Sequence, residues 1–200
     1  MAEKFGGVDW SKRSAAERQF FEDHTFAAMA IGRPTDVGKP SNAATVFGYM
    51  GESKAPQHTS ILRGETSGKD TGQQNAMRHT LWAAFSTQAT DEATARQALS
   101  AHEDNKLADL TTQIFKSYAA GDMAVDYRNN EIGYQLMKQN PGASRKDLAA
   151  AAAKEFKDKG LWVLKETPQG YVASREKMTQ QQYDSYMKGL QNKDDDARWK

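Results

Sequence analysis

The chain has 200 residues, 38% of them hydrophobic and 26% charged, which suffices for one modest core but not for two full domains. Lys and Arg total 27 against 26 Asp and Glu, so no strong overall field is present to attract phosphates, and a dedicated nucleic-acid binder is disfavoured. The absence of cysteine excludes disulfides, Cys-ligated zinc and thiol nucleophiles.

Targeting signals are weak throughout the chain. The longest apolar stretches fall far below the roughly 20 residues of a membrane span, and the N-terminal segment lacks the basic-then-apolar layout of a signal peptide. We therefore expect no integral membrane segment. If the protein is exported, we expect a route that needs no cleaved signal.

The hydrophobic periodicity predicts a mainly α fold, a helical bundle formed as a single domain by residues 1–200. Segment 1–32 contains a capping box, Ser14 to Glu17, that opens a helix ending near Gly32. Segment 33–72 holds three of the five prolines and six glycines without a sustained period, which predicts a long irregular loop serving as a lid, a partner-binding arm or a linker.

Segment 73–173 is the expected motif-bearing core. Its pattern predicts helices over 75–88, from a cap at Thr90-Asp91 to His102, over 107–118, from Asp122 to Met137, and over 144–159, then a β-hairpin near 161–173. No further strand is expected. Segment 174–200 is predicted to hold a last helix, capped by Thr179, and a polar tail.

The first polar cluster lies in the helix over 75–88. Asn75, His79 and Trp82 are spaced so that they share one helical face, with Arg78 beside them. A polar pair next to an indole suggests the wall of a pocket, although a buried histidine bonded to Asn75 or to a backbone carbonyl would fit equally well.

The second cluster is His102-Glu103. His102 continues the apolar stripe of its helix, so we expect it to point inward, and Glu103 lies at the margin of that stripe. Burial can raise the pKa of such a carboxyl until it serves as a general acid or base near neutral pH. The alternative is a Glu paired with a cation such as Arg78.

The third cluster is in the helix from Asp122. Asp126, Asn130 and Gly133 share a face, and Asn129 adjoins it. A glycine inside a helix costs about 1 kcal/mol relative to alanine, so we expect close approach of another helix or of a ligand to offset that cost.

The three clusters lie on separate helices that can converge in one bundle interior. His79, His102, Glu103 and Asp126 could hold a divalent cation, but no HExxH spacing occurs, and metal-free acid–base chemistry is preferred. No cofactor is predicted with certainty. The chain also lacks a G-x-S-x-G elbow, a Walker A loop, a dinucleotide glycine motif and an EF-hand loop, which disfavours the corresponding enzymes.

The ordered set Asn75-Ala76-x-Arg78-His79-x-x-Trp82, Ala101-His102-Glu103 and Asp126-x-x-Asn129-Asn130-x-x-Gly133, followed by an Ala-rich helix, resembles a bacterial domain family of unknown function. The resemblance covers about residues 70 to 166. That family occurs in C-terminal payloads of Rhs-type and other polymorphic toxins. Here Asn75 stands where Asp is usual and Val125 where Met is common, so no acid role is carried over to position 75.

The resemblance implies a secreted or injected bacterial effector with a cognate immunity protein and a secretion-system component as partners. With the clusters, it leads to the hypothesis of an antibacterial toxin that hydrolyses a cell-envelope substrate, peptidoglycan or phospholipid. His79, Glu103 and Asp126 are the predicted catalytic residues, and the residues predicted to bind or orient substrate are Asn75, Arg78, Trp82, His102, Asn129 and Asn130. The alternatives are a metal-dependent toxin acting in the cytoplasm on nucleic acid or a nucleotide, and a non-enzymatic helical adaptor.

Overall fold

A computed structural model describes residues 4–5, 8–9, 13–48, 62 and 72–196. The helices of this part are α1 Ala15–Asp23, α2 Thr25–Ile31, α3 Pro40–Gly48, α4 Gln73–Ala89, α5 Glu92–His102, α6 Tyr118–Gln139, α7 Arg145–Asp158 and α8 Gln180–Gln191. The strands are β1 Lys4–Phe5, β2 Val8–Asp9, β3 Ile114–Phe115, β4 Leu161–Thr167 and β5 Gly170–Glu176. The predicted mainly α class is confirmed. None of the described helices is long and apolar enough to cross a membrane.

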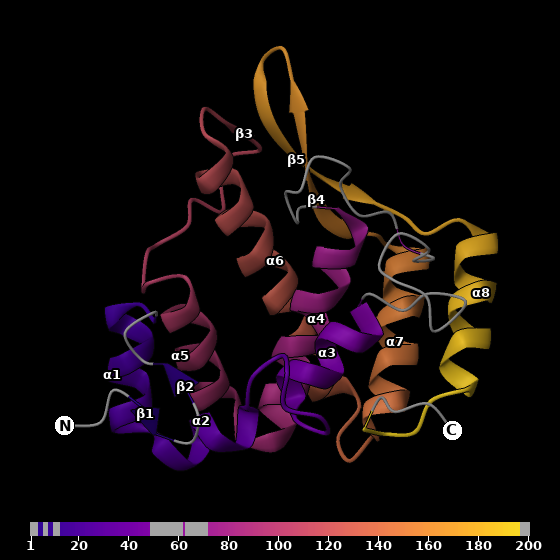
Figure 1. The fold of residues 1–200 in the computed structure, drawn as a ribbon. Helices are drawn as coiled ribbons and strands as arrows, with labels where there is room; N and C mark the ends of the chain where they lie inside the picture. The colour runs from indigo at the N-terminus through magenta and orange to yellow at the C-terminus, as the bar shows by residue number, and fades with distance from the viewer. Residues whose placement is uncertain (1–3, 6–7, 10–12, 49–61, 63–71, 197–200) are drawn as a thin grey trace.

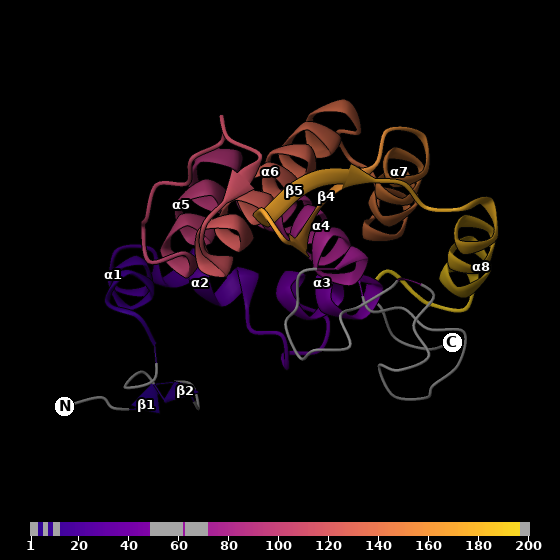
Figure 2. The same ribbon diagram turned by 90° about the horizontal axis from the view of Figure 1, so that it is seen from above.

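The helices form a row with α4 and α6 at its centre. Figures 1 and 2 show α1 and α5 on one side of this central pair, and α7 and then α8 on the other. Helix α3 packs on α4, and the β4–β5 hairpin lies over one end of the central pair. Every polar cluster found in the sequence is therefore on or beside α4 and α6.

Side-chain caps begin several of these helices where the sequence predicted. Ser14 and Glu17 form the capping box of α1, and Asp91 accepts a hydrogen bond from the backbone N–H of Thr94 at the start of α5. Helices α7 and α8 begin with capping boxes of their own. These caps satisfy backbone donors that the first turn of a helix leaves without partners.

Gly133 explains how closely the central helices pack. A Cβ built on this residue would lie 2.1 Å from the carbonyl oxygen of Thr80 and 2.8 Å from the Cβ of Ala83. No side chain fits there, so glycine is required for α6 to approach the backbone of α4. The mid-helix glycine is therefore explained by helix–helix contact.

The main core fills the space between α3, α4, α7 and α8. The predicted Ala-rich helix is α7, which buries Leu148, Ala149, Ala152, Ala153 and Phe156. Small side chains on α7 let it pack closely, and the larger side chains of α4 and α8 complete the cluster. This core sits on the side of α4 away from α5.

The predicted hairpin is confirmed, and its strands pair antiparallel with Leu161 opposite Glu176 and Thr167 opposite Gly170. No further strand was expected, but β1 pairs with β2, and β3 joins the other edge of β5 to give the order β3-β5-β4. The predicted helix over 107–118 is therefore wrong. Residues before β3 run irregularly, and Asp109 caps a turn by accepting hydrogen bonds from Thr111 and Thr112.

Three other boundaries differ from the prediction. The N-terminal helix is two helices, because the chain breaks at His24 between α1 and α2. The segment 33–72 contains α3, which begins at Pro40, since proline is tolerated in the first turn; residues 49–61 and 63–71 of that segment lie outside the described residues. Helix α6 begins at Tyr118, capped by Ser117, and continues through Gly121.

Candidate active site

The first and third polar clusters meet at the contact between α4 and α6. Asn75 and His79 project from α4, and Asp126 and Asn130 from α6, with all four residues at most 5% exposed. Asn75 Nδ2 donates to Asp126 Oδ1 over 3.0 Å. The predicted convergence of these two helices is therefore observed.

His79 is the centre of this buried network. Its Nδ1 lies 3.3 Å from Asn130 Oδ1, and its Nε2 lies 2.8 Å from Arg78 Nη2 and 3.3 Å from Asp126 Oδ2. Because a guanidinium only donates hydrogen bonds, Nε2 accepts from Arg78 across the shorter contact, and the ring proton is on Nδ1, facing Asn130. With this tautomer, Asp126 Oδ2 lies near Nε2 without accepting a hydrogen bond from the ring. The contacts thus assign both the tautomer and the orientation of the ring.

Burial is also the main reason that the pKa of His79 lies well below its ordinary value, and the positive charges of Arg78 and His102 lower this pKa further. The hydrogen bond to Asn130 acts in the opposite direction without reversing the shift. His79 is therefore neutral at physiological pH. A neutral, buried imidazole engaged on both nitrogens is suited to holding its neighbours in place.

Arg78 connects the network to the surface. Its Nη2 also donates to Asn75 Oδ1 over 2.5 Å, so the network fixes the guanidinium from two sides. The same side chain lines a cavity of about 600 Å³, together with Trp82 of α4 and His102 of α5. Arg78 is thus the member of the network that lines this cavity.

His102 lies at the wall of this cavity. Its Nδ1 is 3.5 Å from Glu17 Oε1, and its ring meets the indole of Trp82 edge-on with 4.9 Å between centroids. The expectation that His102 points inward is wrong, since its side chain is 40% exposed. Helix α1 packs against α5 here, so Glu17 and Trp82 hold His102 at the surface.

Glu103 follows His102 at the end of α5 and is only partly exposed. Burial raises the pKa of its carboxyl, although the positive charges of His102, Arg78 and Lys106 act against that shift. The predicted direction of this shift agrees with the structure. A carboxyl whose pKa is raised beside cationic groups has the properties of a proton donor.

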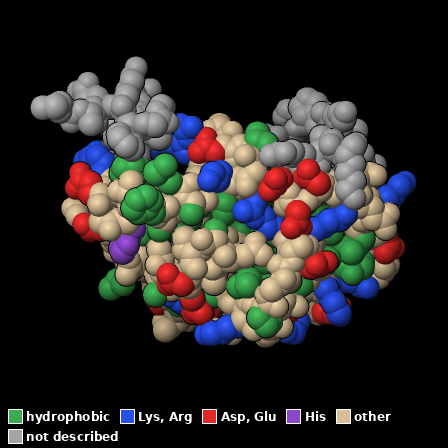
Figure 3. All heavy atoms as spheres, turned by 90° about the horizontal axis from the view of Figure 1, so that it is seen from below, with side chains coloured by type: hydrophobic (Ala, Val, Ile, Leu, Met, Phe, Trp, Pro, Cys, Tyr) green, Lys and Arg blue, Asp and Glu red, His purple; other side chains and the backbone are tan. Residues whose placement is uncertain are grey.

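Aromatic and aliphatic side chains form most of the cavity's remaining wall. Helices α1 and α2 contribute most of them, Phe20, Phe21, Phe26, Met29 and Ile31. Phe26 is 89% exposed and Met29 54% exposed. Seen from below, hydrophobic side chains appear at the surface over these N-terminal helices (Figure 3). The cavity therefore combines an apolar side with a polar end.

Asn129 does not belong to this site. Its side chain donates to the carbonyl oxygen of Trp162 over 2.8 Å and accepts from the Trp162 N–H over 2.9 Å. It pairs with the backbone of β4 as a neighbouring strand would. The predicted orienting role of Asn129 in the His79 site is wrong, because its side chain bonds to the backbone of β4 and not to the His79 network.

The four conditional metal ligands do not assemble. Within the described residues no group of three or more His, Asp and Glu side chains is arranged to hold a metal ion. His79 and Asp126 contact each other, whereas His102 contacts Glu17.

Sequence reasoning did not assign Glu17 or the Phe side chains of α1 and α2 to a site. Glu17 was interpreted only as the acidic member of the capping box, a role that it also has. No sequence signal could have found them, because the exposure of Phe26, a large apolar side chain of the kind that often marks a binding site, is visible only in the structure.

Comparison with known proteins gives the family but no activity. Residues 41–160 match the family described as Domain of unknown function (DUF6973), which is more than half of the chain. The chain belongs to this family. The match begins earlier than the expected position 70, so α3 is included. No curated protein and no solved structure matches the chain.

Proposed function

We propose that this member of the family is a secreted bacterial effector that hydrolyses a cell-envelope substrate, and that the substrate is a lipid. One observation carries the proposal: a cavity of about 600 Å³ has an apolar, aromatic side from α1 and α2 and a polar end with Arg78 and His102. Binding sites of this kind orient a ligand by a few polar groups and bury its apolar part.

A phospholipid suits this cavity better than peptidoglycan does. An acyl chain would contact Phe20, Phe21 and Ile31, whereas a glycan strand would need many hydrogen-bonding groups along the wall. Two of the three other cations that line the cavity are paired, Arg33 with Asp36 at 2.7 Å and Arg13 with Glu17 at 3.2 Å, and Lys39 is the third. Arg78 is placed to face the headgroup or ester end of the substrate.

The proposed reaction is acid–base hydrolysis of an ester. His102, oriented by Glu17, takes a proton from water as the oxygen of that water attacks the ester carbonyl. Arg78 stabilises the negative charge that develops on the carbonyl oxygen. Glu103 gives its proton to the leaving alcohol oxygen as the C–O bond breaks. The proton that His102 took from water then passes through solvent to the Glu103 carboxylate and restores the starting state of both residues.

His79, Asp126, Asn75 and Asn130 are positioning residues in this proposal. The predicted catalytic roles of His79 and Asp126 become indirect, because the two side chains are buried and contact each other and Arg78 or Asn75. Their effect on the reaction passes through the orientation of Arg78. Glu103 keeps the acid–base role predicted for it.

The biological setting rests on the toxin-like motif set. As an antibacterial toxin, the protein would be injected or secreted by a route without a cleaved signal, with a secretion-system component as its carrier. An immunity protein in the producing cell would block the cavity. These partners belong to the proposal and are tested with it.

The biochemical test uses purified protein on phospholipid vesicles and, in parallel, on isolated peptidoglycan, with released fatty acids and muropeptides measured by chromatography. We expect fatty-acid release alone. Glu103→Gln and His102→Gln should lower the rate at least about 100-fold. Asp104→Asn and His24→Gln make the same chemical changes at residues without a role in the proposed reaction and should leave the rate unchanged. Release of muropeptides alone, or full activity in Glu103→Gln, would contradict the proposal.

Growth assays separate the alternatives. We expect expression with an added periplasmic signal to stop growth of a bacterial host, and the Glu103→Gln variant to be harmless. Killing from the cytoplasm that a chelator abolishes would support the metal-dependent toxin instead. Harmlessness in both compartments, with His79→Ala lowering stability, would support a helical adaptor.

A further inference from the structure

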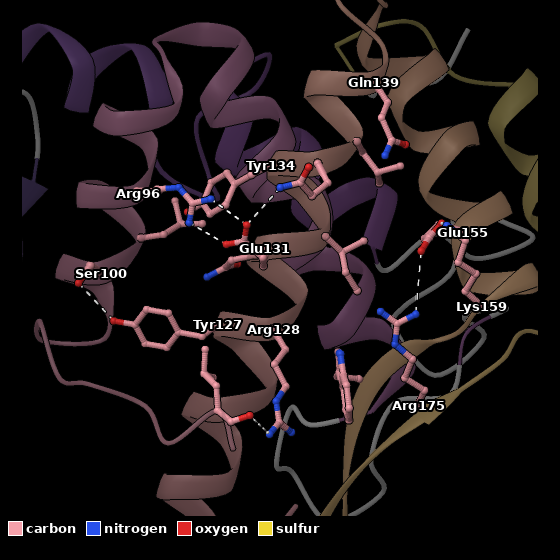
Figure 4. Close-up of a pocket in the computed structure, with 17 residues that line it drawn as sticks. Arg96, Ser100, Tyr127, Arg128, Glu131, Tyr134, Gln139, Glu155, Lys159 and Arg175 are labelled. Atoms are coloured by element: carbon pink, nitrogen blue, oxygen red, sulfur yellow. Dashed lines mark hydrogen bonds and ion pairs between the residues drawn. The ribbon is translucent and has the colours of Figure 1, made fainter. Parts of the chain in front are cut away.

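A second groove lies on the other side of the molecule, along α6 (Figure 4). It encloses about 570 Å³ between α5 on one side and α7 with the β4–β5 hairpin on the other. None of the residues that line the first cavity lines this groove. Asn130 of the His79 network does line the groove, so a ligand here would occupy a site separate from the first cavity but beside that network.

The charges on the α5 side of the groove are matched. Arg96 forms two hydrogen bonds with the Glu131 carboxylate, at 2.7 and 2.9 Å, and a third with Glu92 at 3.0 Å. Its guanidinium also lies over the ring of Tyr134, 4.1 Å from the centroid. Arg96, the cation on this side of the groove, is therefore already paired with carboxylates.

Arg128 on the hairpin side is different. Its side chain is buried, and Nη2 donates to the carbonyl oxygens of Leu110 and Thr112 at 2.9 and 2.6 Å. Nη1 is buried without a hydrogen-bond partner in the described part of the chain. The negative charge of Asp109 acts on Arg128, but burial has the larger effect and lowers the pKa of the guanidinium. A buried guanidinium nitrogen without an acceptor is costly.

A second guanidinium approaches the same ring. The Arg128 carbon Cζ lies 4.4 Å from the Trp162 ring centroid and the Arg175 Cζ lies 5.6 Å from it. The two arginines come from different elements, α6 and β5, and the Asn129 side chain fixes the backbone of Trp162 between them. Trp162 thus brings two cations together on a rigid support.

On the hairpin side of the groove, only one carboxylate among the lining residues forms ion pairs with the cations. Glu155 lies 2.9 Å from Lys159 Nζ and 4.0 Å from Arg175 Nη1. Figure 4 shows the Arg175 guanidinium pointing toward Glu155, with Arg128 on the opposite side of this half of the groove. Among the residues that line this half of the groove, Arg128, Arg175 and Lys159 therefore present three positive charges against the one negative charge of Glu155, and Asp109 acts on Arg128 from outside the lining.

We propose that this half of the groove binds the phosphate group of a small molecule, with Arg128 and Arg175 as its main ligands and Lys159 at its edge. Phosphate fits because its several acceptor oxygens can take hydrogen bonds from guanidinium groups that arrive from two elements. The matching chemistry belongs to inorganic phosphate and to phosphomonoesters. Neither ligand would contact the residues that line the first cavity.

The test follows the thermal unfolding of the full chain as inorganic phosphate replaces chloride at constant ionic strength. We expect the midpoint to rise by about 3 °C or more once phosphate exceeds its dissociation constant tenfold. Glycerol phosphate and vesicles containing phosphatidic acid, tested in separate arms, distinguish a soluble ester and a lipid headgroup from the free ion. Calorimetric titration with phosphate gives the dissociation constant directly.

Arg175→Gln should abolish the phosphate-dependent rise while the fold stays intact, because this side chain is 36% exposed. Arg128→Met should abolish it as well. Lys165→Gln removes a cation from the same hairpin at a position outside the groove and should keep the full response. No rise in the wild-type protein, or an equal rise in Arg175→Gln, would overturn the proposal.

Discussion

The two faces of α6 carry polar clusters of opposite character. Toward α4, Asp126 and Asn130 belong to a closed network in which His79 uses both ring nitrogens. Toward the hairpin, Arg128 is also buried but leaves Nη1 without an acceptor among the described residues. The members of the first cluster bond to one another, whereas the second leaves a buried guanidinium nitrogen without an acceptor in this part of the chain.

The comparison distinguishes buried polar residues that stabilise the fold from buried polar residues that favour binding of a ligand. A buried network whose donors and acceptors match stabilises one arrangement of two helices and needs nothing further. A buried cation whose charge is not matched costs free energy until an anion binds. Substitutions on the two faces of α6 should therefore change the stability of the protein by different amounts.

Gly133→Ala should be the most damaging single change, because both faces of α6 depend on its close packing against α4. Although alanine gains about 1 kcal/mol in helix propensity, the added Cβ would collide with the Thr80 carbonyl oxygen, and we expect a net loss of about 3 kcal/mol. Urea unfolding measures this loss. Gln135→Ala, an exposed change two residues further on, should alter stability by less than about 0.5 kcal/mol; equal effects of the two would show that the packing is loose.

His79→Ala should cost about 3 kcal/mol, because it removes the partner of Asn130 and Arg78 and leaves a cavity between the helices. The measurement is again urea unfolding, at pH 7.5. The control is His24→Ala, since His24 is partly exposed and stacks only on Phe20, with centroids 5.1 Å apart. A loss in His79→Ala no larger than in His24→Ala would mean that the network does not hold the helices.

The pH dependence of stability should report the same network. The pKa of His79 lies well below 6.5 in the folded protein, so between pH 6.5 and that lower value only the unfolded chain binds the proton. The contribution of His79 is therefore complete above about pH 6.5 and is lost as pH falls, by up to about 1.4 kcal/mol per pH unit. Unfolding measured at pH 7.5, 6.5 and 5.5 should show this slope, and His79→Gln should flatten it. A slope that persists in His79→Gln would assign it to other groups.

Arg128→Met should have the smallest effect on stability without phosphate, within about 1 kcal/mol of wild type. The change loses the hydrogen bonds to Leu110 and Thr112 but also removes a buried guanidinium whose Nη1 has no acceptor among the described residues, and the two effects offset each other. Thermal and urea unfolding in chloride measure the sum. A loss as large as that of His79→Ala would show that Arg128 is part of the structural framework, and the contrast between the two faces would fail.

Local signals in the sequence were reliable where local physics decides. The caps at Ser14, Asp91, Ser144 and Thr179 begin helices as predicted, and the turn between the strands of the hairpin is where Pro168 indicated it. Helix α3 was missed because its surroundings are rich in proline and glycine. Pro40 itself was the signal that could have found it, since proline favours the first turn of a helix.

The candidate site could be predicted only in part. Helical spacing correctly placed Asn75 with His79 and Asp126 with Asn130, and the two pairs do meet. Spacing placed Asn129 beside them, but a side chain one position further along a helix turns by about 100° and reaches another neighbour, here Trp162. His102 was predicted to be inside, yet α1 and Trp82 hold it at the surface.

By itself, therefore, the sequence determined the mainly helical class, the hairpin, most helix starts and the polar residues that α4 and α6 bring together, because these depend on periodicity and capping within a few residues. Only the tertiary structure decided which of these residues are buried, which reach a cavity, that Glu17 meets His102, and that Arg128 and Arg175 both approach the ring of Trp162. These pairs lie tens of residues apart in the chain. Their contact depends on how whole helices pack, which no local pattern encodes.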